Sequence, residues 1–159
     1  MGARWLTSET RLKLARKRTS LGRALSRSPR VLHYFHRVDD PYSQLMVQIL
    51  PDFLARFDVE FAPHVVERLP ANMYPDPARY EALAILDSVR LARLYGFGFP
   101  GMAMVPDRLA VGMAARHLAA LESSPAAFLE AAQELGTALW RQDIKAVRSI
   151  AGGAGLESE

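Results

Sequence analysis

The chain contains no cysteine among its 159 residues. Without a thiol, its own residues form no disulfide, supply no thiolate to a metal and perform no dithiol–disulfide exchange. Apolar runs are short as well, and none approaches the roughly 18 residues of a membrane span. The basic N-terminal segment lacks the apolar core of about 7–15 residues that a secretory signal needs. We therefore expect a cytoplasmic protein.

Acidic residues are scarce at the N-terminal end. Residues 1–37 hold ten of the twenty Lys and Arg residues and one acid, Glu9, so that residues 38–159, with ten cations and sixteen acids, carry a net charge of −6. A basic, serine-rich, acid-poor leader is also typical of an organellar transit peptide. No nucleic-acid recognition motif accompanies the charge. We expect residues 1–29 to form a solvated basic arm, helical between Thr7 and Arg27, rather than a surface for nucleic acid or an anionic membrane.

The next segment predicts a strand followed by a helix. Residues 31–37 are rich in aromatic and branched side chains, which is typical of a strand. Asp40 suits the N-cap of a helix and Pro41 its first position. The apolar spacing that follows predicts that this helix continues to Arg56, with Pro51 kinking it or weakening one turn.

The remainder predicts one more strand and then helices alone. Residues 59–66 favour a strand, in which Pro63 indicates an edge position or an early end. Amphipathic spacing and caps predict helices at 78–95, 107–121, 125–139 and 142–150. We expect Met102, Met104 and Met113 to lie in the core or to line a cleft. The order indicates an α/β chain that is mostly helical by residue count.

The turn Asp40-Pro41-Tyr42-Ser43 lies between the first predicted strand and its helix, which is the layout of the thioredoxin active site. In this respect the chain resembles the DsbA-like branch of the thioredoxin superfamily, especially 2-hydroxychromene-2-carboxylate isomerase and the kappa-class glutathione transferases. The similarity extends over about residues 31–155, and its further motifs are the segments 88–96 and 138–144.

The resemblance implies a partial thioredoxin-like fold (β-α-β) at 30–69, a helical domain, inserted or appended, at 70–155 and a tail at 156–159. It implies glutathione as a cofactor and a small hydrophobic or aromatic compound as substrate for isomerisation or transfer. It also implies that Asp40 and Ser43 are catalytic, with Asp40 as base, and that Pro41 and Tyr42 shape the site for the thiol.

The chain departs from the family pattern in two ways. The relatives have a serine at the position of Asp40, and an ionised carboxylate accepts hydrogen bonds where a serine hydroxyl donates one to the thiolate. In addition, nothing after Trp140 predicts the remaining strands of a thioredoxin core. We therefore expect a fragment, or a chain that a homo-oligomer or another domain completes, because a two-stranded sheet is marginal alone.

A non-catalytic interaction module remains open as the alternative. On this interpretation Asp40 is a plain N-cap, and the basic arm or a sheet edge recruits a partner. The histidines do not favour a metal site. His33 and His36 lie three apart on a strand and therefore face opposite ways, whereas His64 is expected beside one of them across the sheet. We expect no metal.

Overall fold

A computed structural model describes residues 29–67 and 76–153, together with positions 9, 12–14, 17, 18 and 22. Residues 1–31 and 32–159 form two compact units. The backbone is helical at the described positions before residue 23, and Lys13 and Glu9 form an ion pair of 3.5 Å there. The other positions of the helix predicted between Thr7 and Arg27 lie outside the described residues, as does the tail at 156–159.

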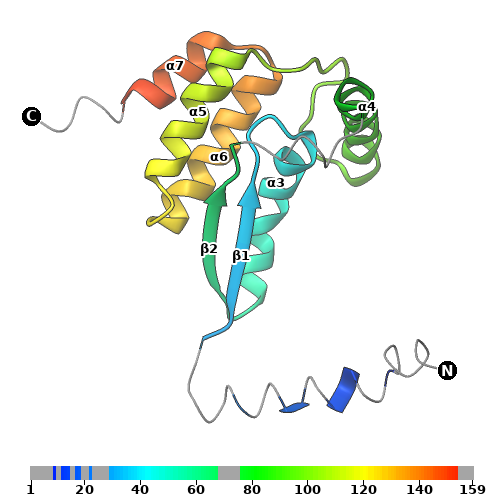
Figure 1. Cartoon of the computed structure of the whole chain (residues 1–159), viewed down its shortest axis with the longest axis vertical. Helices are drawn as coiled ribbons and strands as arrows, with labels where there is room; N and C mark the ends of the chain where they lie inside the picture. The colour runs from blue at the N-terminus through cyan, green and yellow to red at the C-terminus, as the bar shows by residue number, and fades with distance from the viewer. Residues whose placement is uncertain are drawn as a thin grey trace, which may run out of the picture. The chain divides into compact units, whose positions relative to one another are not determined.

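Two parallel strands with a helix between them form a β-α-β unit (Figure 1). Its elements are β1 (Val31–His36), α3 (Pro41–Arg56) and β2 (Glu60–Val65). The strands are neighbours in a two-stranded sheet, and the N–H of Val66 donates to the carbonyl of His36 at 2.8 Å. The α/β class and the helical majority expected from the sequence are confirmed.

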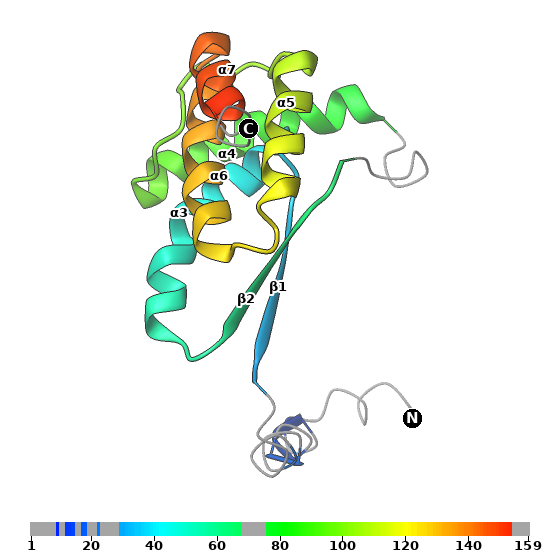
Figure 2. The same ribbon diagram turned by 90° about the vertical axis from the view of Figure 1, so that its left-hand side faces the viewer.

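Four helices follow the sheet: α4 (Pro77–Tyr95), α5 (Arg108–Ala120), α6 (Pro125–Trp140) and α7 (Ile144–Gly153). Gly96 ends α4 with a φ of 74°, a left-handed conformation that favours glycine. Helix α4 packs on α3, whereas α5, α6 and α7 pack on one another and α6 also packs on α3 (Figures 1 and 2). Within residues 29–67 and 76–153, no helix has the length and apolar character needed to cross a membrane.

The hydrophobic core lies among α5, α6, α7, α3 and one face of the sheet. Tyr34 on β1 and Phe61 and Val65 on β2 pack against it. The opposite face carries Phe35, of which 64% is exposed. The largest fully buried apolar side chains of the core are Phe128, Leu118, Leu135, Leu139, Val47 and Val147.

Pro51 lies inside α3 without ending it. A proline has no N–H, so the carbonyl of Val47, one turn earlier, loses its helical partner. The side-chain amide of Gln133 on α6 donates to that carbonyl at 2.7 Å. A contact between two helices thus replaces the missing bond within one of them, and α3 continues to Arg56.

Pro63 lies on an edge of the sheet, as predicted. Backbone groups of successive strand residues point to opposite sides, and Val66 donates toward β1. The backbone N–H of Val65 therefore points to the outer edge of the sheet, where it donates to the carboxylate of Glu122 at 2.6 Å. The nitrogen of Pro63, two residues earlier, faces the same edge, where the described residues contain no third strand that needs an N–H donor.

Candidate functional site

Asp40 is the N-cap of α3, as the sequence predicts. Its backbone is extended, and its carboxylate atom Oδ2 accepts from the backbone N–H of Ser43 at 2.8 Å. The same oxygen accepts from the Ser43 hydroxyl at 2.9 Å. The structure therefore brings together the two side chains that the resemblance names as catalytic, and it joins them directly to each other.

Ser43 is a buried residue, 8% exposed, and its hydroxyl has two hydrogen-bond partners. It donates to Asp40 and accepts from the backbone N–H of Arg37 at 3.3 Å. A hydroxyl has one proton to donate, so the proton of Ser43 is held by the carboxylate that caps its own helix. This arrangement stabilises the turn between β1 and α3.

A second chain of hydrogen bonds runs beneath the turn, from His36 through Tyr34 to the backbone of Ser43. Tyr34 donates to the Ser43 carbonyl at 3.2 Å, and Nδ1 of His36 lies 2.9 Å from the same phenol oxygen. Because a phenol has one proton, His36 donates from Nδ1 and carries its proton there. The imidazole bonds to Tyr34 and not to the Ser43 hydroxyl.

Burial controls the ionisation of this pair. His36 is 3% exposed, and burial lowers its pKa to about 4. Burial also raises the pKa of Tyr34 well above its ordinary value, and the nearby carboxylate of Asp40 raises it further. Both side chains are therefore neutral near pH 7, and neither adds a charge to the turn.

Pro41 and Tyr42 face the α4 side of the turn. The phenol of Tyr42 donates to Oδ2 of Asp87 at 2.9 Å. Partial burial and this bond to a carboxylate raise the pKa of Tyr42 to about 12. Pro41 lines a cavity of about 10 Å³ that Tyr80 and Val105 also line, which is room for one water molecule.

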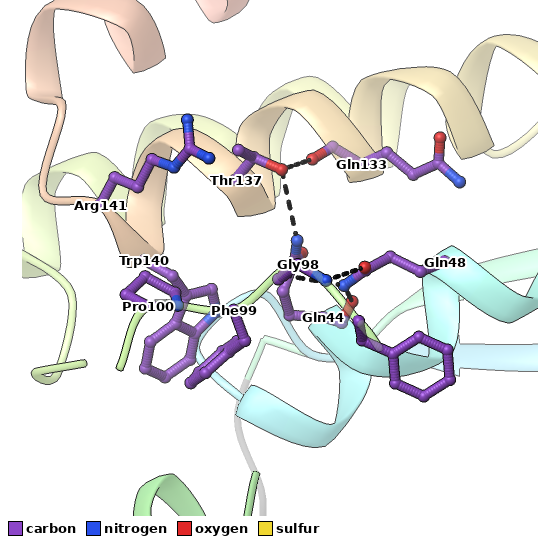
Figure 3. Close-up of a pocket in the computed structure, with 10 residues that line it drawn as sticks. Gln44, Gln48, Gly98, Phe99, Pro100, Gln133, Thr137, Trp140 and Arg141 are labelled. Carbon is purple, nitrogen blue, oxygen red and sulfur yellow. Dashed lines mark hydrogen bonds between the residues drawn. The ribbon is translucent and has the colours of Figure 1, made fainter. Parts of the chain in front are cut away.

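A larger cavity lies between α3, residues 97–100 and α6 (Figure 3). Its volume is about 620 Å³. The side chains of α6 form one wall, and α3 with the 97–100 segment forms the other (Figure 3). Its lining residues are Gln44, Gln48, Phe97, Gly98, Phe99, Pro100, Gln133, Thr137, Trp140 and Arg141.

Paired hydrogen bonds fix the position of the 97–100 segment. The side-chain amide of Gln48 accepts from the N–H of Gly98 at 2.8 Å and donates to its carbonyl at 3.1 Å. The ring centroids of Phe99 and Trp140 lie 5.1 Å apart. Because two directed bonds and an aromatic contact hold this segment, the wall of the cavity is built without a ligand.

Gln44 closes the floor between α3 and α6. It is 3% exposed, and its amide lies so close to Gly136 that a Cβ at that position would overlap Oε1 and approach Cδ to 2.7 Å. Within the described part of the chain, Oε1 of Gln44 and Nε1 of Trp140 are buried without a hydrogen-bond partner. The two walls of the cavity meet here through a close contact that only glycine permits.

The site residues predicted from the sequence do not include the glutamines that line the cavity. Gln44 and Gln48 are one turn apart on α3, and Gln133 and Thr137 have the same spacing on α6. Uncharged polar pairs at this spacing on two apolar helices are the signal that indicates a shared polar lining.

No family model, no curated protein and no solved structure matches the chain.

Proposed function

We propose that the chain is a non-catalytic ligand-binding protein built on a partial thioredoxin-like fold, and that it binds a small peptide-like acid of the glutathione class. The cavity between α3, residues 97–100 and α6 carries this proposal. Its volume of about 620 Å³ lies within the range of roughly 300–1,000 Å³ that is usual for small-molecule sites.

The lining of the cavity suits such a compound. Arg141 is the charged residue among the ten lining residues, and a guanidinium pairs with a carboxylate through two parallel hydrogen bonds. The rings of Phe99 and Trp140 offer an apolar wall beside the polar side chains of Gln133 and Thr137. A peptide-like acid presents carboxylates, amide groups and an apolar or thiol-bearing part to these partners.

The turn supports binding without catalysis. The Ser43 hydroxyl and backbone N–H both donate to one oxygen of Asp40, which is the arrangement of a helix cap. The negative charge also occupies the N-terminus of α3, where a thiolate would otherwise be favoured. We infer that Asp40 contributes to stability rather than to chemistry.

A glutathione-dependent isomerase or transferase, acting on a small hydrophobic or aromatic compound, is the second candidate. The observation that favours it is the carboxylate of Asp40 at the N-terminus of α3, whose charge also acts on the phenol of Tyr42. In this case Asp40 removes a proton from the substrate or thiol, and Pro41 and Tyr42 shape the thiol site.

Calorimetric titration with reduced glutathione tests the cavity. We expect Arg141→Gln to weaken binding about tenfold or more, because a hydrogen bond to a charged group contributes about 1.5–3 kcal/mol. Arg148→Gln is the matched control, since Arg148 is an exposed arginine on α7 outside the cavity lining. Equal affinity in the two variants would place the ligand elsewhere.

The variant Asp40→Ala separates the two candidates. Loss of the cap is expected to lower the free energy of unfolding by about 1 kcal/mol, with glutathione affinity unchanged. Asp76→Ala is its control, because Asp76 caps α4 in the same way. Loss of glutathione-dependent turnover in Asp40→Ala alone would establish the enzyme, and loss of affinity alone would place the ligand at the turn. A folded protein without glutathione affinity would remove both candidates.

A further inference from the structure

The two strands carry a pair of histidines on the face of the sheet opposite the core. His33 on β1 is exposed and His64 on β2 is half-buried, and Nδ1 of the first lies 3.0 Å from Nε2 of the second. Their ring centroids are 5.3 Å apart and the ring planes are inclined by 21°. The two nitrogens therefore face each other, and a single proton is shared between them.

We propose that His33 and His64 form a binding site for a divalent transition metal of the copper or nickel type. Neutral imidazole is a preferred ligand of these ions. Two nitrogens bonded to one metal at about 2.0–2.1 Å are separated by about 2.9 Å at a right angle and about 3.4 Å at the tetrahedral angle. The observed separation of 3.0 Å falls between these two values, so both nitrogens can reach one metal ion after a small turn of a ring, and among divalent ions copper(II) and nickel(II) bind nitrogen ligands with high affinity.

When both rings are neutral, binding of the metal requires no net change in the number of protons on them. In the hydrogen-bonded pair one of the facing nitrogens carries a proton, and coordination needs a lone pair on both. Each neutral imidazole has two nitrogens and one proton, so the proton of each ring moves to, or stays on, the nitrogen that faces away. His33 then carries its proton on Nε2 and His64 on Nδ1. The exposed ring of His33 turns so that the two lone pairs converge on the metal.

The surroundings leave room for this rearrangement and orient one of the rings. Phe35, two residues after His33 on the same face, stacks on His64 with ring centroids 5.0 Å apart. This contact positions His64, while the ring of His33 faces solvent. The residues that the structure describes contain no group of three or more potential ligands, so water molecules complete the coordination.

A metal in this position joins the two strands of a sheet that is marginal by itself. The ligands are 31 residues apart in the sequence and meet in the folded sheet, so a metal held by both binds the folded chain in preference to the unfolded one. We therefore expect the bound metal to raise the melting temperature. Neither His33 nor His64 lines the cavity between α3 and α6, so the metal site and the cavity are separate.

Titration of the full chain with nickel(II) chloride, by calorimetry and by thermal unfolding, tests the site. We expect one nickel ion per chain and a raised melting temperature. Both effects should be lost in His33→Gln and in His64→Gln, with affinity at least about tenfold lower, since even groups that only support a ligand change metal affinity about 10–100-fold. His117→Gln is the matched control, because His117 lies on α5. Wild-type affinity in His33→Gln or His64→Gln would overturn the site, as would loss of binding in His117→Gln.

Electron paramagnetic resonance of the copper(II)-loaded wild-type protein gives a test that needs no variant. Coupling of the copper to nitrogens from two imidazoles is expected. Coupling to one imidazole would contradict a site formed by this pair within one chain, as would one nickel ion per two chains in the titration.

Discussion

The side-chain amide of Gln133 on α6 donates to the carbonyl of Val47 on α3 at 2.7 Å. That carbonyl lacks its helical partner because residue 51 is a proline. Gln133 also lines the large cavity. One residue therefore corrects a defect in α3 and holds one wall of the cavity to the other.

Replacing Gln133 with methionine keeps the length of the side chain and removes its donor. We expect Gln133→Met to lower the free energy of unfolding in urea by about 1–3 kcal/mol, because the Val47 carbonyl is then buried without a partner. In a Pro51→Ala background, Ala at position 51 supplies the missing N–H, so the same substitution should cost clearly less. An equal cost in both backgrounds would show that Gln133 does not replace the helical bond.

Gln142 has a φ of 59°, a left-handed conformation that is uncommon for residues other than glycine. Its side-chain amide donates to the carbonyls of Met104 and Val105 at 3.1 and 3.3 Å. Both Gln142→Ala and Gln142→Gly remove these bonds, but only glycine relieves the backbone strain, which is about 1–2 kcal/mol. We expect the glycine variant to be the more stable of the two in thermal unfolding, and the reverse order would contradict strain at this position.

Burial of His36 makes stability depend on pH. Its pKa is about 4 in the folded protein, whereas an exposed histidine has a pKa of about 6.5. Between these values the unfolded chain binds a proton that the native chain does not, so stability falls as the pH falls. From pH 7.5 to pH 5 we expect a loss of about 2 kcal/mol from this residue. His36→Gln should remove this part of the slope in urea denaturation, and an unchanged slope would contradict a buried neutral His36.

Local signals in the sequence were sufficient for the elements and for the turn. Asp40 and Pro41 start α3, and Gly96 ends α4, because capping depends on residues next to each other. The expectation for two methionines was wrong, since 93% of Met102 and 64% of Met104 is exposed. Their side chains lie in the segment between α4 and α5, and apolar character alone does not determine which side of such a segment is covered.

The cavity could not be predicted in the same way, because its walls are far apart in the sequence. Gln44 and Thr137, which are within 3.5 Å of each other through their side chains, are 93 residues apart. Such a pair becomes visible only when the packing of α3 on α6 is known. The pairing of His33 with His64 was partly predictable, because the sequence placed His64 beside either His33 or His36 across the sheet, and the register of the two strands, which the sequence does not show, decides between them.

Gly136 on α6 tests the contact at the floor of the cavity. A methyl group at this position would overlap the buried amide of Gln44, so we expect Gly136→Ala to lower the free energy of unfolding by about 1–3 kcal/mol. Gly112→Ala on α5 is the matched control, because the nearest atom to its Cβ would be 3.6 Å away on Arg116. There the higher helix propensity of alanine should raise stability by up to about 1 kcal/mol. Opposite signs for the two substitutions would show that the amide of Gln44 occupies the space that glycine leaves, and stabilisation by both would contradict the contact.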